Sequence, residues 1–304
     1  MEYNLITILG PTATGKTKLA ASLAYELNGE IISADSRQVY KGMDIGTGKD
    51  LADYIIEGNK VPYHLIDIIE PAEEFNLFLF KQFFYKSFNS IIVRNKIPFL
   101  AGGTGLYLSS VIQNYDLKKA DFNPDRINEL NTFDIDSLKN ILLRLNSKLH
   151  NTTDLLSKDR IIKAILIAES NEELQNEVIK IHSLNIGIMP SREIIKKRIT
   201  DRLKYRLQNG MIEEVKNLVD IGISYEKLNF FGLEYKFVGL HLKGELNYND
   251  MFQKLNSAIY GFAKRQISWF KKMENEGVRI NWIDEPDIDK AKIIILQNEY
   301  ISSP

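Results

Sequence analysis

A glycine-rich segment near the start of the chain, "LGPTATGKT" (residues 9–17), constrains the fold more than any other feature. It satisfies the full pattern G-x-x-x-x-G-K-[ST], follows a short apolar run (3–9) and precedes apolar residues at helical spacing (16–28). Glycines in such a loop let backbone N–H groups converge on phosphate oxygens, and the positive end of the following helix attracts the same anion. Lys16 adds a full charge, and the Thr17 hydroxyl is placed to ligate Mg²⁺. The segment therefore predicts a strand–loop–helix unit that binds a diphosphate or a triphosphate.

Several further apolar runs end in polar residues or glycine, which is typical of strands in a parallel sheet. They alternate with helical patterns, and such units imply parallel strands joined by right-handed crossovers. We therefore predict an α/β fold of the P-loop NTPase-like type, a parallel sheet flanked by helices. The later strands are expected at 30–36, 64–69, 97–103, 184–190 and 278–283, and the longer helices at 76–95, 159–169, 192–221 and 249–275.

The polar stretch 114–150 interrupts this pattern, because it contains no strand signal. We predict a small helical insertion domain there. Residues 1–113 and 151–304 are expected to form the P-loop α/β catalytic core with a helical C-terminal part. A chain of 304 residues, 44% of them hydrophobic, is long enough for a large domain that carries a smaller one.

Composition excludes several protein classes. The chain has no cysteine, so it can form neither a disulfide nor a thiolate metal site. It shows no secretory signal and no apolar run near the roughly 20 residues that span a bilayer, so we expect a cytoplasmic protein without membrane contact. Lys and Arg number 39 against 40 Asp and Glu, which argues against a histone-like protein but allows a local basic patch. Residues 192–206 form such a cluster, although a lone basic cluster is more typical of a solvated helix face.

Two loops that follow expected strands carry candidate catalytic residues, because ligands of parallel sheets bind at the carboxyl ends of the strands. Asp35 ends the second strand, in "ADSRQVY" (34–40), and would lie near the bound phosphates. The strand expected at 97–103 ends in "FLAGGTGLY", which offers the Thr104 hydroxyl but no carboxylate. A hydrolytic ATPase usually has an Asp there to hold its metal, so the sequence disfavours an ATPase or a motor.

Taken together, these motifs resemble those of the tRNA dimethylallyltransferases, also called tRNA isopentenyltransferases. "GPTATGKT" is similar to the family's phosphate loop, and "ADSRQVYKGMDIGTGK" (34–49) matches its second signature almost residue for residue. The resemblance runs from about residue 5 to residue 283. Further matching segments are "AGGTGLY" (101–107), "DRIIKAILIAE" (159–169), "RITDRLKYRLQNGMIEEVKNL" (198–218) and "AKRQISWF" (263–270).

The resemblance implies a reaction. The loop would bind dimethylallyl diphosphate instead of ATP, and the exocyclic amine of the adenosine 3′-adjacent to the anticodon in tRNA would attack it. The products would be N6-isopentenyladenosine and pyrophosphate. Lys16, with Mg²⁺ on Thr17, would stabilise the departing pyrophosphate. Asp35 would accept the proton of the amine, and Thr104 would face the same centre. The implied diphosphate-binding residues are Gly10, Thr12, Ala13, Thr14, Gly15, Lys16, Thr17 and Arg265.

The same resemblance implies contacts with the anticodon stem-loop of tRNA, whose target base would have to leave its stack. We expect the enzyme to act as a monomer, with the insertion at 114–150 contacting tRNA. The implied tRNA-binding residues are Asp35, Ser36, Arg37, Gln38, Thr104, Arg126, Asp159, Arg160, Ile161, Ile162 and Lys163. The basic segment then supplies candidates for phosphate-backbone contacts, namely Arg192, Lys196, Lys197, Arg198, Arg202 and Lys204.

Three departures from the family pattern stand out. The family's T-R-Q before its K-R-Q reads Ile259–Tyr260–Gly261 here, so an expected diphosphate-binding arginine is missing and Arg265 or another basic residue would substitute. The family's G-Y-K-E reads "GLEY" (232–235). The inserted region is short, which affects how much of the anticodon stem it could contact. Such changes are consistent with an altered RNA preference.

Other functions fit parts of the sequence. A small-molecule kinase would hold ATP on the same loop and use Asp35 as its base, but the sequence lacks an Arg-rich lid motif. An isopentenyltransferase of free AMP, ADP or ATP would need neither the basic helix nor the insertion. An RNA-binding protein with an inactive loop would not need the intact pair Lys16 and Thr17 together with Asp35 and Thr104.

Overall fold

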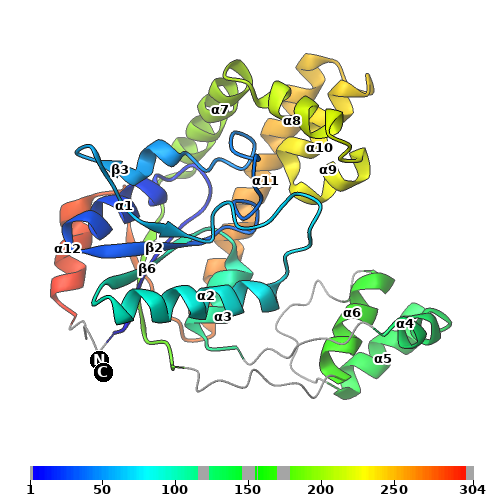
Figure 1. The fold of residues 1–304 in the computed structure, drawn as a ribbon, viewed down its shortest axis with the longest axis horizontal. Helices are drawn as coiled ribbons and strands as arrows, with labels where there is room; N and C mark the ends of the chain where they lie inside the picture. The colour runs from blue at the N-terminus through cyan, green and yellow to red at the C-terminus, as the bar shows by residue number, and fades with distance from the viewer. Residues whose placement is uncertain (1–2, 116–122, 146–154, 156, 170–178, 299–304) are drawn as a thin grey trace. The chain divides into compact units, whose positions relative to one another are not determined.

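A computed structural model describes residues 3–115, 123–145, 155, 157–169 and 179–298 of the chain (Figure 1). It divides into two compact units, a core unit of Met1–Asn114 with Lys180–Pro304 and a smaller unit of Tyr115–Ile179. In the described ranges, no helix combines the length and the apolar character that a bilayer crossing requires.

The core unit is built on a six-stranded parallel sheet with the strand order β5-β2-β6-β1-β7-β8 (Figure 1). This confirms the predicted α/β fold. The strand expected at 64–69 is the exception: its pairing is displaced to Tyr63–His64, and Ile69 makes only an isolated bridge to Tyr40. The strands are β1 (Leu5–Leu9), β2 (Gly29–Ala34), β5 (Tyr63–His64), β6 (Ile97–Gly102), β7 (Ser183–Ile188) and β8 (Asn281–Ile283), and a separate antiparallel hairpin consists of β3 (Ile55–Ile56) and β4 (Asn59–Lys60) after a short 3₁₀ helix (Leu51–Tyr54).

The register of the sheet brings three loops to one edge. Leu9, the last residue of β1, pairs with Gly102 of β6, and Ala34 at the end of β2 pairs with the same glycine. All three strands therefore end at one level. The phosphate loop, the loop beginning at Asp35 and the turn at Gly103 consequently leave the sheet side by side, as the sequence predicts for a parallel sheet.

Helices cover both faces of the sheet. On one face α1 (Lys16–Glu26) and α12 (Ile288–Leu296) bury Leu23 and Ala291 in one apolar cluster (Figure 1). On the other face α2 (Leu77–Val93) and α3 (Gly105–Ile112) meet through the stacked rings of Phe80 and Tyr107, whose centroids are 3.9 Å apart.

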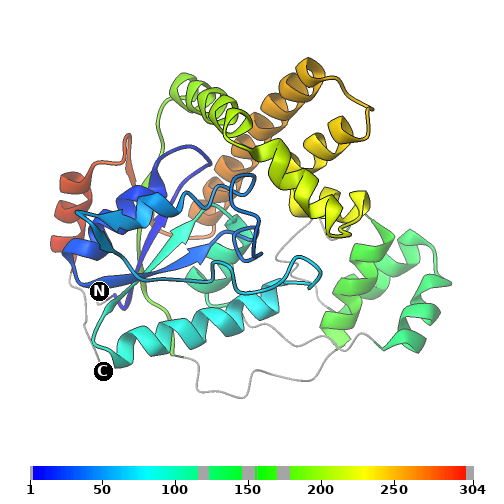
Figure 2. The same ribbon diagram turned by 45° about the horizontal axis from the view of Figure 1, so that its top comes forward.

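A helical layer completes the core unit. The basic stretch predicted as one helix over 192–221 is instead two, because Gly210 adopts a φ of +100° and ends the regular path. The long helix predicted over 249–275 is confirmed and packs against the basic helix (Figure 2). The five helices are α7 (Arg192–Gln208), α8 (Met211–Asp220), α9 (Tyr225–Phe231), α10 (Leu233–Leu242) and α11 (Tyr248–Asn275).

The smaller unit contains α4 (Pro124–Asn131), α5 (Ile135–Leu145) and α6 (Lys158–Glu169). The predicted insertion ends at residue 150, but the observed unit extends to Ile179, so that boundary is wrong. The reason is that α6, which the prediction assigned to the core, buries Ile161 and Ile165 in one apolar cluster with residues of α4 and α5. Parts of the predicted insertion, residues 116–122 and 146–150, lie outside the described residues.

Candidate active site

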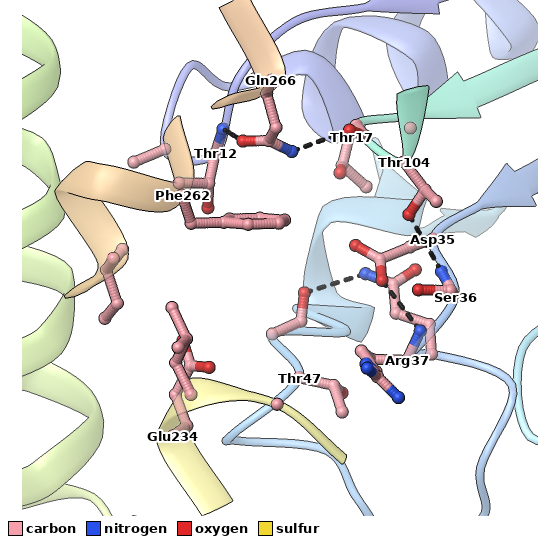
Figure 3. Close-up of a pocket in the computed structure, with 18 of the residues that line it drawn as sticks. Thr12, Thr17, Asp35, Ser36, Arg37, Thr47, Thr104, Glu234, Phe262 and Gln266 are labelled. Carbon is pink, nitrogen blue, oxygen red and sulfur yellow. Dashed lines mark hydrogen bonds between the residues drawn. The ribbon is translucent and has the colours of Figure 1, made fainter. Parts of the chain in front are cut away.

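A cavity of about 620 Å³ opens at the carboxyl edge of the sheet (Figure 3). Its walls come from the phosphate loop, from the loops after β2 and β6, and from α7, α10 and α11. In Figure 3, Asp35, Ser36 and Thr104 lie on one side, while Phe262 and Glu234 project from the helices on the other. The structure thus brings the predicted catalytic residues Asp35, Thr104 and Lys16 together.

The conformation of the phosphate loop is stabilised by residues of the loop itself. Gly15 has a φ of +82°, which glycine adopts without strain, and the buried Thr14 hydroxyl donates to the Pro11 carbonyl at 3.0 Å. No side chain of the described residues caps the N-terminus of α1, so its first N–H groups are left for a ligand. Gly10 does not line the cavity, and its contact with the diphosphate stays a prediction. A Cβ atom there would lie 2.8 Å from the Ile188 carbonyl oxygen, so Gly10 allows the chain to pass β7.

Lys16 is the cation at the start of α1. Its Nζ lies 3.4 Å from the Pro11 carbonyl oxygen, and burial lowers its pKa to about 8, with Asp35 opposing that shift and Arg202 adding to it. A lysine that has lost much of its hydration interacts strongly with an anion placed beside it. This electrostatic environment suits a phosphate group.

Asp35 and Thr104 are fixed by backbone hydrogen bonds. The Asp35 carboxylate accepts from the Arg37 N–H at 3.0 Å, and the Thr104 hydroxyl accepts from the Ser36 N–H at 3.1 Å. Both side chains line the cavity and are half-buried. The carboxylate retains lone pairs to accept a proton, and the hydroxyl retains its hydrogen to donate.

Gln266 of α11 connects two walls of the cavity and was missed by the sequence analysis. Its amide oxygen accepts from the Thr12 N–H at 2.9 Å, and its amide nitrogen donates to the Gly103 carbonyl at 2.8 Å. The side chain is 6% exposed. The matching segment "AKRQISWF" pointed to this helix but not to the glutamine.

Two arginines of α7 also line the cavity, Arg202 and Arg206. Arg202 donates to the Thr12 hydroxyl, and burial, together with the nearby Arg206, lowers its pKa to about 10. The prediction that Arg202 belongs to an exposed RNA-backbone surface is therefore wrong, because its guanidinium lies against the phosphate loop. Arg192, Lys196, Lys197 and Lys204 of the same helix are exposed, and Arg198 forms an ion pair with Glu285 at 2.7 Å.

The cavity also has an apolar wall. Ile259, Phe262 and Trp269 of α11 line this side, and the Trp269 indole N–H donates to the Ser109 hydroxyl at 2.8 Å. Glu234 of α10 also lines the cavity, where loss of solvent raises the pKa of its carboxyl group and the nearby Arg206 and Arg202 oppose that shift. Arg265 lines the cavity as predicted but is exposed, with its guanidinium carbon 5.9 Å from the centroid of the Phe262 ring.

The residues predicted to contact tRNA divide between the two units. Ser36 and Arg37 line the cavity, and the Arg37 guanidinium lies 5.0 Å from the Phe230 ring centroid. Gln38 also lines the cavity, but its side chain is used internally: it accepts from the Ser33 hydroxyl at 2.9 Å and donates to the Gly48 carbonyl at 3.1 Å.

The remaining predicted contacts lie in the smaller unit. Arg126 forms ion pairs with Glu129 at 2.6 Å and Glu169 at 2.5 Å. Ile161 and Ile162 are 0% and 4% exposed, so the prediction that their side chains contact tRNA is wrong, since they form the apolar core of this unit. The other predicted residues of α6, which are Asp159, Arg160 and Lys163, are exposed.

Comparison with known proteins gives a consistent result. The model of the IPP transferase family matches residues 38–273, and that of the isopentenyl transferases matches residues 3–67. The chain is 52% identical over 293 residues to tRNA dimethylallyltransferase 1 of Geotalea uraniireducens (strain Rf4), covering 96% of each chain. It is 47% identical over 296 residues to tRNA dimethylallyltransferase 1 of Syntrophus aciditrophicus (strain SB), covering 96% of this chain and 97% of that one.

Solved structures agree with the fold. The full-length tRNA isopentenylpyrophosphate transferase from Bacillus halodurans has a TM-score of 0.68 at 32% identity, covering 97% of this chain and 96% of its own. A eukaryotic dimethylallyltransferase acting on tRNA has a TM-score of 0.74 at 22% identity, covering 98% of this chain and 77% of its own, and shows the fold alone. Since one family model spans well over half of the sequence, the chain belongs to the IPP transferase family.

Proposed function

We propose that the chain transfers a dimethylallyl group from dimethylallyl diphosphate to the exocyclic amine of the adenosine 3′-adjacent to the anticodon in tRNA. The products are N6-isopentenyladenosine and pyrophosphate. One observation carries the proposal: a single cavity joins a phosphate loop, the carboxylate of Asp35 and an apolar wall. These are the three environments that a diphosphate, an attacking amine and a prenyl tail require.

Departure of the diphosphate is the step that the phosphate loop assists. Cleavage of the allylic carbon–oxygen bond leaves both electrons, and hence negative charge, on the pyrophosphate oxygen. The free N–H groups at the start of α1, Lys16 and Arg202 are positioned around that end of the cavity. Donors that are held in place before the reaction stabilise developing charge without reorganising.

Asp35 is suited to remove the proton from the amine. The adenine amine is a weak nucleophile because its lone pair is delocalised into the ring, so its N–H must be lost as the new carbon–nitrogen bond forms. The Arg37 N–H fixes the orientation of the Asp35 carboxylate at 3.0 Å. A positioned base of this kind typically contributes about 10²–10⁴-fold to the rate. Thr104 lies beside it and can donate to the bound base.

The apolar wall accounts for the choice of a prenyl donor. Ile259, Phe262 and Trp269 provide a surface against which a five-carbon tail can pack, and a tail packed there would help to keep water from the reacting carbon. A nucleoside triphosphate bound with its ribose against this wall would bury hydroxyl groups at a cost.

The site also fits a magnesium ion. Mg²⁺ prefers oxygen ligands and usually keeps several waters. The Thr17 hydroxyl and the carboxylates of Asp50 and Asp53 line the cavity, while within the described ranges no three acidic or histidine side chains gather at one point. Thr17 would therefore hold the ion together with water and diphosphate oxygens, and the ion would neutralise charge on the leaving group.

The RNA partner is an anticodon stem-loop. The side chains available to it include exposed Asp159, Arg160 and Lys163 of the smaller unit, Arg37 at the cavity, and the exposed Arg192, Lys196, Lys197 and Lys204 of α7. We further expect a monomeric enzyme in the cytoplasm. Sedimentation of the purified protein with and without the stem-loop tests the first of these expectations.

The test of the function uses a synthetic anticodon stem-loop with dimethylallyl diphosphate, and in parallel with ATP. Nucleosides from the digested RNA are then weighed by mass spectrometry. An adenosine heavier by one C₅H₈ unit is expected with the prenyl donor only. Release of phosphate from ATP without prenylation would instead indicate a phosphotransferase. Prenylation of free AMP in preference to the stem-loop would indicate a nucleotide isopentenyltransferase.

A further inference from the structure

Arg206 occupies an unusual position in the cavity wall. It follows Arg202 by four residues on α7, so both side chains emerge from the same face of that helix. Arg206 is nevertheless only 5% exposed. A guanidinium is among the most costly groups to bury unless its N–H groups are paired.

The pairing of Arg206 is incomplete. Among the described residues, its one ion pair joins Nη2 to the Asp50 carboxylate at 3.4 Å, which is long, and half of the Asp50 side chain is exposed. Its Nε is buried and has no acceptor among the described residues. Buried donors are paired in the great majority of proteins, so a guanidinium that is this poorly paired and that lines a cavity indicates a ligand that accepts from its Nη groups.

The loop opposite Arg206 is shaped to hold this guanidinium. A Cβ atom at Gly48 would overlap the Arg206 guanidinium, and Gly48 has a φ of +66°. The loop itself is anchored, because the Glu214 carboxylate accepts from the N–H groups of Ile45 at 2.7 Å and Gly46 at 2.9 Å. The Arg206 side chain is therefore confined between an anchored loop and its own helix, at a defined place in the cavity wall.

The charges around the cavity identify the class of ligand. Arg206 lies close enough to Lys16 and Arg202 to influence the pKa values of both in the direction expected of a neighbouring cation. Lys16, Arg202 and Arg206 all line the cavity that the phosphate loop forms, together with Asp35, Asp50 and Glu234. Three cations on the walls of one such cavity match a ligand with several negative charges. Arg265, the cation that the sequence favoured, is exposed and lies over Phe262, so it is less constrained than Arg206.

We propose that Arg206 is a second arginine of the diphosphate site, donating to a phosphate oxygen of the prenyl donor beside Arg202. This inference rests on the proposed function for the identity of the donor, but its diphosphate part can be tested without any prenyl group. Arg206 thereby supplies from α7 a guanidinium that Tyr260 of α11 does not offer.

The experiment measures binding of inorganic pyrophosphate to the full chain by calorimetry and by the pyrophosphate-induced rise in melting temperature. The variants are Arg206→Met, which keeps much of the length of the side chain, and Arg206→Lys, which keeps the charge but loses the planar guanidinium with its several N–H donors. Lys86→Met, at an exposed position of α2, controls for the loss of one positive charge. Arg206→Met should weaken pyrophosphate binding by about tenfold or more, the usual effect of losing a charge-assisted hydrogen bond. The pyrophosphate affinity of Arg206→Lys should lie between the affinities of the wild type and Arg206→Met. The affinity of Lys86→Met should equal that of the wild type.

The outcomes separate the two proposals. If Arg206→Met lowers the melting temperature of the free protein but leaves the pyrophosphate-induced rise unchanged, Arg206 is only structural and the inference fails. It also fails if the variant weakens stem-loop binding alone, or if the wild type does not bind pyrophosphate. If pyrophosphate binding depends on Arg206 while the wild type prenylates no RNA, the inference stands and the proposed function falls.

Discussion

The hydroxyl of Thr104 accepts a hydrogen bond from the backbone N–H of Ser36 at 3.1 Å. This bond joins the loop after β6 to the loop after β2, and it fixes the backbone next to Asp35. The hydroxyl of Thr104 thus positions the carboxylate and also presents its own hydrogen to the cavity.

Replacing Thr104 with valine keeps the shape of the side chain but removes the acceptor. The Ser36 N–H then lacks its partner, and the loop that carries Asp35 loses a constraint. We expect kcat to fall by about 3- to 10-fold, the range for one neutral hydrogen bond, with little change in stem-loop affinity. Thr104→Ser retains the hydroxyl and should recover most of the activity in steady-state prenylation assays. A valine variant as active as the serine variant would contradict this role.

Asp35→Asn is a sharper test of the base than alanine, because an asparagine oxygen can still accept from the Arg37 N–H. The loop should keep its conformation while the proton acceptor is lost. Single-turnover prenylation should slow by about 10²-fold or more. Stem-loop affinity, measured by filter binding, should stay within a few-fold of the wild type. Unchanged turnover would remove Asp35 from the role of base.

Binding of the diphosphate should depend on pH through Lys16. Its pKa is lowered to about 8 by burial, so the ammonium form, which attracts the anion, is lost as the pH rises through that value. The affinity for dimethylallyl diphosphate should therefore be greatest below about pH 8 and should decline above it. Calorimetry between about pH 6.5 and 9.5 measures this, and in Lys16→Met the decline around pH 8 should be absent and the affinity low throughout. If Lys16→Met impairs only RNA binding, our placement of the two substrates is reversed.

Gln266→Leu should destabilise the core unit. The substitution leaves the Thr12 N–H and the Gly103 carbonyl without their present partner, and each unpaired buried group costs about 1–3 kcal/mol. The free energy of unfolding in urea should fall accordingly, and affinity for the prenyl donor should fall with it. Gln253→Leu, at an exposed position on the same helix, is the matched control and should change neither. Equal stability of the two variants would refute the bridging role.

Local sequence signals were sufficient to predict the elements that form the catalytic edge of the sheet. The phosphate loop and the residues Asp35 and Thr104 each follow a short apolar strand, so their meeting point follows from the rule for parallel sheets. Arg202 and Arg206 could not be placed in this way. Their segment is basic on several faces of the helix, and only the packing of α7 against α11 and the phosphate loop decides which face is buried.

Two further features depend on contacts between residues far apart in the sequence. Gln266 is 254 residues from Thr12, and no local pattern relates them. The boundary of the smaller unit depends on Ile161 and Ile165, whose spacing of four indicates a buried helix face but not the unit into which it is buried. Sequence periodicity shows that such a face exists, whereas its partner is determined by tertiary packing.

The bridge made by Gln266 has a mechanical consequence. The Gln266 amide joins the phosphate loop, which would bind the donor, to the turn after β6, which would lie beside the acceptor. Neither segment can shift relative to the other without breaking a hydrogen bond to Gln266. We therefore expect the phosphate loop and the turn after β6 to move as one body when the products leave.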